Sequence, residues 1–149
     1  ERESIDLGSL AQVLCEEFEA VARSSRHEVE TGVEGQPRGV GDEQRTLQIG
    51  RILVENALVH TPPGTRVRVT AAAQNGRALL AVEDEGPGIP AAQREHVFER
   101  FYRVDGAVAA GSGLGLAIAK ELAELMGGTI EIESQNGTTR FVLALPAAA

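Results

Sequence analysis

The stretch Ala78-Leu79-Leu80-Ala81-Val82-Glu83-Asp84-Glu85-Gly86-Pro87-Gly88 runs from an apolar strand into a carboxylate and a glycine-bearing turn. Successive side chains of a strand point to opposite faces, so Asp84 shares a face with Leu80 and Val82 and ends an apolar row. A buried carboxylate needs a hydrogen-bond donor, and adenine offers an exocyclic amine where guanine has a carbonyl. The stretch therefore predicts either a carboxylate that selects adenine or an aspartate that caps the turn that follows it.

Glycines follow this carboxylate and recur later in the chain. Gly86 and Gly88 would let the chain turn beneath a planar ring, with Ile89 packed against that ring. A second cluster, Gly111-Ser112-Gly113-Leu114-Gly115-Leu116, opens an apolar helix. The free N–H groups and the dipole at a helix start favour an anion such as a phosphate. Because the spacing fits neither the dinucleotide-binding nor the Walker pattern, a flexible loop remains an alternative for this cluster.

An aromatic string, Phe98-Glu99-Arg100-Phe101-Tyr102-Arg103, and a run of small residues, Val104 to Ala110, lie between the glycine clusters. Small side chains suit a segment that opens and closes, so we expect a mobile lid at about residues 102–112. Phe98 and Phe101 are expected to anchor this lid in apolar surface.

An asparagine on an apolar helix face is a further candidate. A helix is expected from about Asp42 to Val59. Intervals of four and three residues separate Ile49, Leu53 and Asn56 within it. This spacing puts the amide on the stripe that should face a sheet. A buried amide without partners costs roughly 1 to 3 kcal/mol, so a partner is expected. Asn56 is interpreted either as a satisfied core amide or as a ligand of a Mg2+ ion that bridges phosphates.

The rest of the chain predicts an α/β fold. Further helices are expected over 7–23 and from 113 or 114 to 126, with a polar, glycine-rich segment at 31–41 and hairpin turns at Asn75-Gly76 and Asn136-Gly137. This pattern predicts one domain, residues 1–149, built as a two-layer α/β sandwich: a mixed sheet with helices packed on one face. The net charge of -8 argues against a nucleic-acid or anionic-membrane surface, and it requires Mg2+ and local donors around any triphosphate.

The combined motifs resemble the catalytic ATP-binding domain of sensor histidine kinases, in the GHKL superfamily that includes gyrase, Hsp90 and MutL. The resemblance covers nearly the whole chain and implies the Bergerat form of the sandwich. Residues 56–62 are similar to the N box, 84–88 to the G1 box, 98–103 to the F box and 111–116 to the G2 box. The segments 127–129 and 137–141 resemble the family's last hairpin.

The resemblance implies roles for the matching residues. Asn56 would coordinate Mg2+, Asp84 would bind the adenine amine, and His60 would stack on adenine. Arg103 would reach the terminal phosphate, although an exposed arginine in a solvated lid is the alternative. The implied catalytic residues are Arg103 and Asn56, and the implied nucleotide-binding residues are Asn56, His60, Asp84, Gly86, Gly88, Ile89, Gly111, Gly113, Leu114, Gly115, Leu116 and Thr139.

Two departures from the family pattern remove polar groups near the expected phosphates. Many relatives have asparagine at the position of Ile52 and lysine or arginine at the position of Val59. Weaker nucleotide affinity or slower transfer is therefore expected. ATPase relatives carry a water-activating glutamate at the position of Ile52, so an efficient hydrolase is not expected. Glu55 is adjacent to Asn56 but points elsewhere around the helix, and its role stays open.

The expected function is to bind Mg-ATP and supply its γ-phosphate to a histidine in two-component signalling. None of His27, His60 and His96 lies in a phosphoacceptor string, so the acceptor is expected on a separate dimerisation domain of a longer parent. The expected partners are that domain and a response regulator receiver domain, without nucleic acid or direct membrane contact. The parent is expected to be a membrane-anchored homodimer, and this part monomeric and cytoplasmic. The alternatives are a non-catalytic nucleotide-gated module and an anti-sigma-type serine kinase.

Overall fold

The computed structural model describes residues 3–86, 92, 96–99, 115–135 and 137–148. Most of the expected F box and G2 box lies outside these residues, as does the lid expected at 102–112. The predicted site residues outside them are Gly88, Ile89, Arg103, Gly111, Gly113 and Leu114.

The central element of the fold is a five-stranded mixed sheet with the order β2-β4-β5-β7-β6. Its strands are β2 (Glu28–Val33), β4 (Arg66–Gln74), β5 (Arg77–Asp84), β6 (Thr129–Gln135) and β7 (Thr138–Pro146). β2 and β4 are parallel, and the other neighbours are antiparallel. Both predicted hairpins are confirmed. Asn75 and Gly76 have φ of 54° and 76°, and Gly137 has φ of 78°, the left-handed conformation that tight hairpin turns require.

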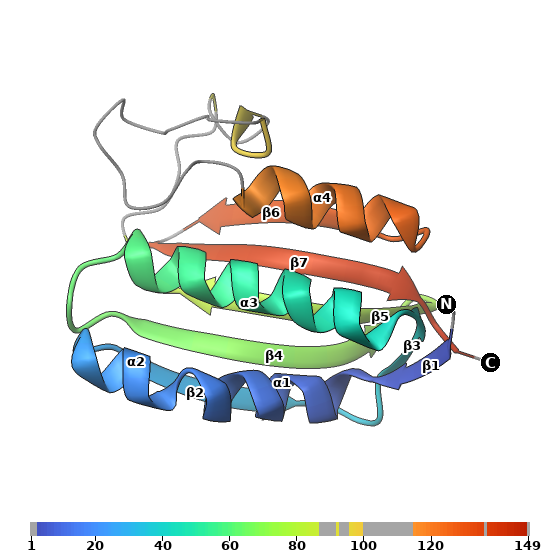
Figure 1. The fold of residues 1–149 in the computed structure, drawn as a ribbon, viewed down its shortest axis with the longest axis horizontal. Coiled ribbons are helices and arrows are strands. Elements are labelled where there is room, and N and C mark those ends of the chain that lie inside the picture. The colour runs from blue at the N-terminus through green and yellow to red at the C-terminus, as the bar shows by residue number, and fades with distance from the viewer. Residues whose placement is uncertain (1–2, 87–91, 93–95, 100–114, 136, 149) are drawn as a thin grey trace.

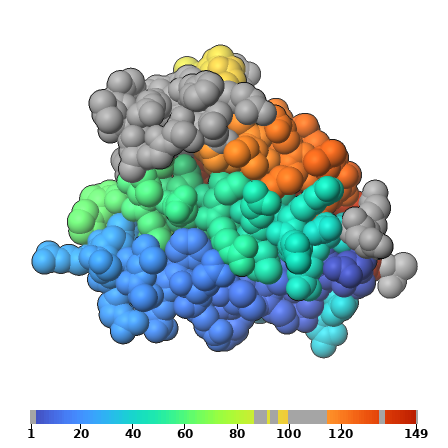
Figure 2. Space-filling view, viewed as in Figure 1, coloured from blue at the N-terminus to red at the C-terminus, as the bar shows by residue number. Residues whose placement is uncertain are grey.

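Helices cover one face of this sheet. They are α1 (Leu7–Glu17), α2 (Glu19–Ser24), α3 (Glu43–Val59) and α4 (Gly115–Leu125). Figure 1 shows α1, α3 and α4 on the same face, and in the space-filling view α3 lies between α1 and α4 (Figure 2). Leu14, Ile49 and Leu53 of the helices and Leu80 and Leu143 of the sheet are fully buried between the two layers. The predicted two-layer α/β sandwich is therefore confirmed.

The prediction of one helix over 7–23 is wrong. The helix is interrupted at Phe18, which has φ of -95° and ψ of 4°. The interruption turns the chain so that Ala22 is buried, at 2% exposure, while Val21 is 53% exposed. An apolar stripe continues through the sequence, but the buried face changes at Phe18.

The glycine-rich segment 31–41 contains strand residues that the sequence did not predict. β3 (Arg38–Gly41) pairs antiparallel with β1 (Glu3–Asp6) as a separate two-stranded sheet, and β2 extends to Val33. Short strands rich in glycine carry little periodic signal, and this pairing joins segments far apart in the sequence. Among the described residues, no helix is both long enough and apolar enough to cross a membrane.

The topology brings four chain segments to one end of the molecule. α3 and β5 end there, and β7 and α4 begin there, at the left of Figure 1. Asp84, the last residue of β5, is paired in register with Thr139 near the start of β7. The described residues of the predicted site are therefore positioned by the ends of regular elements.

Candidate functional site

Asp84 is the buried carboxylate of the site. It is 7% exposed, and its Oδ1 accepts a hydrogen bond of 2.9 Å from the backbone N–H of Gly86. Among the residues that the structure describes, this is the carboxylate's one hydrogen bond. Burial raises the pKa of the Asp84 carboxyl, and the Gly86 N–H opposes this rise. The turn-capping interpretation of Asp84 is thus confirmed for one oxygen, while the second oxygen can accept a further donor.

Thr139 places a hydroxyl beside this carboxylate. It is the direct cross-strand partner of Asp84, and partners in a register project to the same face of a sheet. The residue is 4% exposed, and its Oγ1 is buried without a hydrogen-bond partner in the described part of the chain. An unsatisfied buried hydroxyl costs about 1 to 3 kcal/mol, so a ligand that bonds to this hydroxyl would gain a favourable contact.

Asn56 lies at the border of the buried face of α3. That face includes Ile49, Leu53 and Ala57, whereas Asn56 is half-buried. Three residues turn a helix by about 300°, which puts Asn56 roughly 60° around the axis from Leu53. The amide therefore lies at the edge of the predicted sheet-facing stripe and not within its fully buried part. The side-chain amide has no hydrogen-bond partner among the described residues, so both of its polar atoms can bind a ligand.

His60 is exposed at the C-terminal cap of α3. Its backbone N–H donates a 3.0 Å hydrogen bond to the carbonyl of Asn56. The helix thus ends by bringing these two residues together at the same end of the molecule. The exposed side chain of His60 contributes nothing to the buried stripe.

Gly86 is required by a close approach of the chain. A Cβ at this position would lie 2.6 Å from Cγ2 of Thr61 and 2.9 Å from Oδ1 of Asp84, and neither contact is tolerable. Thr61 belongs to the segment 56–62 that resembles the N box, and it was not among the expected site residues. Its closeness to Gly86 joins the end of the N box to the G1 box, and no local pattern in the sequence indicates this relationship.

The start of α4 packs against the same region of α3. A Cβ added to Gly115 would lie 3.3 Å from Cγ2 of Ile52, and Leu116 is half-buried against the core. Ile52 lies one helical turn before Asn56, on the same side of α3. The described part of the G2 box, Gly115 and Leu116, therefore lies near the helix face that carries Asn56.

Phe98 attaches the F box to the core. Its ring packs edge-on against Phe141, with centroids 6.0 Å apart and an interplanar angle of 87°. Nζ of Lys120 lies 5.9 Å from the centre of the Phe98 ring. The expected packing of Phe98 on apolar surface is confirmed, whereas Phe101 and the lid that the two residues were expected to anchor lie outside the described residues.

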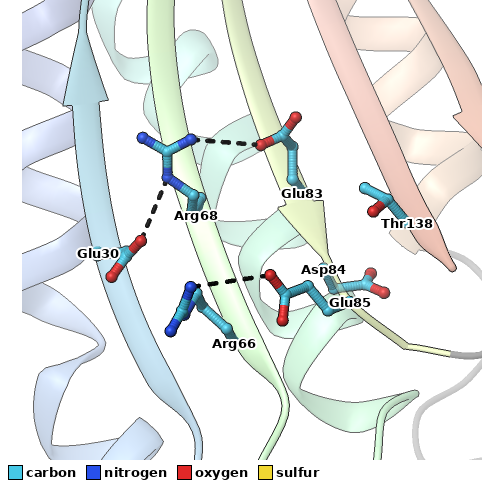
Figure 3. A pocket seen from close by; sticks show the side chains of 7 residues that line it. All are labelled: Glu30, Arg66, Arg68, Glu83, Asp84, Glu85 and Thr138. Carbon is cyan, nitrogen blue, oxygen red and sulfur yellow. Dashed lines mark ion pairs between the residues drawn. The ribbon is translucent and has the colours of Figure 1, made fainter. Parts of the chain in front are cut away.

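A charged hollow of about 310 Å³ lies at the same end of the sheet (Figure 3). Arg68 pairs there with Glu30 at 3.3 Å and with Glu83 at 3.9 Å, and Arg66 pairs with Glu85 at 3.9 Å. Its lining residues are Glu30, Arg66, Arg68, Glu83, Asp84, Glu85 and Thr138. The exposed arginines alternate along β4 with buried valines, so these charges belong to the face of the sheet away from the helices. The sequence interpretation named only Asp84 among the lining residues.

Comparisons with known proteins support a nucleotide-binding interpretation. Residues 41–149 match the family model described as "Histidine kinase-, DNA gyrase B-, and HSP90-like ATPase". The chain is 42% identical over 116 residues to the alginate biosynthesis sensor protein KinB of Pseudomonas aeruginosa, which covers 72% of this chain and 19% of KinB. It is 35% identical over 148 residues to the sensor-like histidine kinase SenX3 of Mycolicibacterium smegmatis, which covers 97% of this chain and 38% of SenX3.

The fold also matches a solved structure of a similar protein. The structure of full-length ShkA in complex with AMPPNP matches with a TM-score of 0.87 and 30% identity, over 100% of this chain and 32% of that one. The chain thus spans 19% to 38% of the length of these three relatives. Because the family model covers most of the sequence, the chain belongs to the histidine kinase-, DNA gyrase B- and HSP90-like ATPase family.

Proposed function

We propose that this domain binds Mg-ATP and supplies the γ-phosphate to a histidine on a separate dimerisation domain of a longer parent. The observation that carries this proposal is the buried pair Asp84 and Thr139. The carboxylate has an oxygen to spare, and the neighbouring hydroxyl has no partner. Adenine presents an amine donor beside a ring-nitrogen acceptor, so it can satisfy both groups, whereas guanine reverses this pattern.

The other described residues suit the remainder of the nucleotide. The Asn56 carbonyl oxygen is a suitable ligand for Mg2+, which would offset the phosphate charge when bound. We assign stacking on the base to His60, with Gly86, Gly88 and Ile89 lining the base. We assign the phosphates to the segment that leads into α4, namely Gly111, Gly113, Leu114, Gly115 and Leu116. We assign the terminal phosphate to Arg103, whose positive charge would stabilise the transferring group. The AMPPNP complex of the similar protein ShkA supports a nucleotide here.

The phosphoacceptor belongs, in this proposal, to the part of the parent that this chain does not span. The matched segment covers 19% of the similar protein KinB and 38% of SenX3, so both are more than twice as long as that segment. The proposed partners are the parent's dimerisation domain and a response regulator receiver domain. The proposed setting is the cytoplasmic side of a membrane-anchored homodimer, with residues 1–149 as one monomeric domain. The net charge of -8 supports the absence of nucleic-acid and direct membrane contacts.

A nucleotide-gated binding module is the second candidate. Ile52 packs on Gly115 and presents an apolar side chain one turn from Asn56. A site with few polar groups around the phosphates could hold ATP and control docking without efficient transfer.

Transfer and binding can be measured separately. The domain is titrated with ATP and GTP, with and without Mg2+, and it is then mixed with the parent's histidine domain and γ-labelled ATP. We expect the domain to bind ATP more tightly than GTP when Mg2+ is present, and we expect the label to appear on the histidine. Arg103→Ala should reduce this transfer far more than it reduces ATP binding. ATP binding without transfer by the unchanged domain would favour the module, and absence of ATP binding would refute both candidates.

A further inference from the structure

We propose that His27 is a positioning residue for Asp84, acting through Thr61 and Gly86. The inference rests on the proposed function, in which Asp84 selects adenine. His27 lies in the turn between α2 and β2, far from Asp84 in the sequence, and no motif includes it. The structure nevertheless connects the two residues through three consecutive contacts.

The His27 side chain is buried, at 7% exposure, with hydrogen-bond partners at both ring nitrogens. Nδ1 lies 2.8 Å from Oγ of Ser25. Nε2 lies 2.9 Å from Oγ1 of Thr61 and 3.3 Å from the Thr61 carbonyl oxygen. The backbone N–H of His27 donates to the carbonyl of Ala22 at 2.8 Å, which fixes the main chain as well.

The hydrogen-bond inventory of Thr61 determines the direction of this contact. Its Oγ1 donates a 2.7 Å hydrogen bond to the carbonyl of Ala57 in α3. A hydroxyl has one proton, so Oγ1 can only accept from His27. The Thr61 carbonyl also only accepts. Nε2 of His27 therefore carries a proton and donates to Thr61, an assignment that follows from the network.

These two hydrogen bonds determine where the Thr61 methyl group lies. Oγ1 and Cγ2 share one Cβ, so holding the hydroxyl in one rotamer also holds the methyl group. This methyl group occupies the space that a Cβ on Gly86 would enter, at 2.6 Å. Gly86 in turn donates its N–H to Asp84 Oδ1 at 2.9 Å. His27 thus sets the position of the peptide that orients the carboxylate.

The main chain joins the same two segments. Arg26 adopts the left-handed conformation, with φ of 64°, which is uncommon for a residue with a side chain. Its carbonyl accepts a 2.7 Å hydrogen bond from Gly64, three residues after Thr61. Backbone strain of this kind persists only where surrounding contacts stabilise it. The α2–β2 turn is therefore held against the segment that follows α3, and the His27 side chain adds the contact that leads to Asp84.

The test compares the affinities for ATP and inosine triphosphate, which carries a carbonyl in place of the adenine amine. Its neighbouring ring nitrogen also carries a proton, so the ratio of the two affinities reports the base contacts of Asp84 and Thr139 together. General destabilisation weakens both nucleotides equally and leaves the ratio unchanged. His27→Leu should lower this ratio by about threefold to tenfold, the scale of one hydrogen bond. His27→Gln, whose amide can donate near the position of Nε2, should restore most of it.

Thr61→Ser supplies a second variant in case the histidine variants fold poorly. It keeps the hydroxyl and removes only the methyl group that contacts Gly86, and it should also lower the ratio. Thr46→Val is the matched control. It removes a buried hydroxyl that donates to the Asp42 carbonyl at 2.8 Å at the opposite end of α3, and it should lower stability without changing the ratio.

The outcomes separate this inference from the proposed function. If His27→Leu and Thr61→Ser both keep the wild-type preference for ATP, the positioning role of His27 is overturned, while adenine selection by Asp84 is not. A wild type that binds the two nucleotides equally would remove adenine selection by Asp84, and the positioning role with it. An equal fall of both affinities in the variants would identify His27 as a purely structural residue.

Discussion

Replacing Asp84 by asparagine should affect binding and stability in opposite directions. The substitution keeps the shape of the side chain and the oxygen that accepts the Gly86 N–H at 2.9 Å. It replaces the remaining oxygen by an amide donor, which cannot accept from the adenine amine. One charge-assisted hydrogen bond is therefore at stake, worth about 1 to 3 kcal/mol, so ATP affinity should fall roughly 5- to 150-fold.

The same substitution should stabilise the nucleotide-free domain at neutral pH. Burial raises the pKa of the Asp84 carboxyl above its ordinary value of 3.8, so the folded protein holds this proton more tightly than the unfolded chain. Where the carboxyl is ionised in both states its burial costs stability. That cost falls as the pH drops through the raised pKa and is absent below about 3.8. Asp84→Asn removes the cost, so its advantage should shrink as the pH falls.

Two measurements on the same samples test this opposition. Calorimetric titration gives the ATP affinity, and thermal unfolding without nucleotide gives the stability, where a gain of about 1 kcal/mol would raise the unfolding temperature by roughly 2 to 4 °C. Unfolding is repeated between pH 7 and pH 4 for both proteins, and the difference between them cancels the other carboxyl groups. Unchanged ATP affinity would refute base selection by Asp84. Lower stability of the variant at pH 7, or an advantage that grows towards low pH, would refute the burial argument.

Three further changes test other parts of the domain. Thr139→Val removes the hydroxyl that has no partner, so the unfolding temperature should stay the same or rise. ATP affinity, measured by calorimetry, should fall about threefold to tenfold. A loss of stability would show that the hydroxyl has a partner. Asn56→Ala should weaken ATP binding about tenfold or more when Mg2+ is present and only slightly when EDTA removes it. If titrations show the same loss of affinity in both conditions, Asn56 is not a Mg2+ ligand. Gly128→Ala puts a Cβ 2.5 Å from the Ala144 carbonyl oxygen. Urea unfolding should show a loss of about 1 to 3 kcal/mol, and unchanged stability would contradict this contact.

Local patterns were sufficient to predict the parts of the site that regular elements carry. The period of two along β5 predicted the burial of Asp84, and the Asn-Gly pair at Asn75 predicted a turn with positive φ, because both depend on neighbours within a few residues. Asn56 lies at the edge of the predicted stripe and not within its fully buried part, because an apolar stripe identifies a face but not its edges. The break at Phe18 was missed because the apolar spacing continues through it.

Contacts between distant segments could not be predicted in this way. His27 and Thr61 are 34 positions apart, and each has an ordinary local interpretation, as a strand entry and a helix stop. Their hydrogen bond exists because the α2–β2 turn lies against the segment that follows α3. The pairing of β1 with β3 has the same origin. One sequence contains no signal for such pairs unless the topology is already known.

The face of the sheet away from the helices contributes to the site through strand register. Five charged residues of alternating sign cross all five strands as direct register partners, Glu30, Arg68, Glu83, Arg140 and Glu133. Their ion pairs span 3.1 to 3.9 Å, and pairs that are exposed or only half-buried in this way add little stability each. They do favour one register, because a slip of one residue would separate every pair and turn Asp84 to the opposite face. The register that aligns these charges is the same one that sets Asp84 opposite Thr139, so the charged row on one face specifies the polar pair on the other.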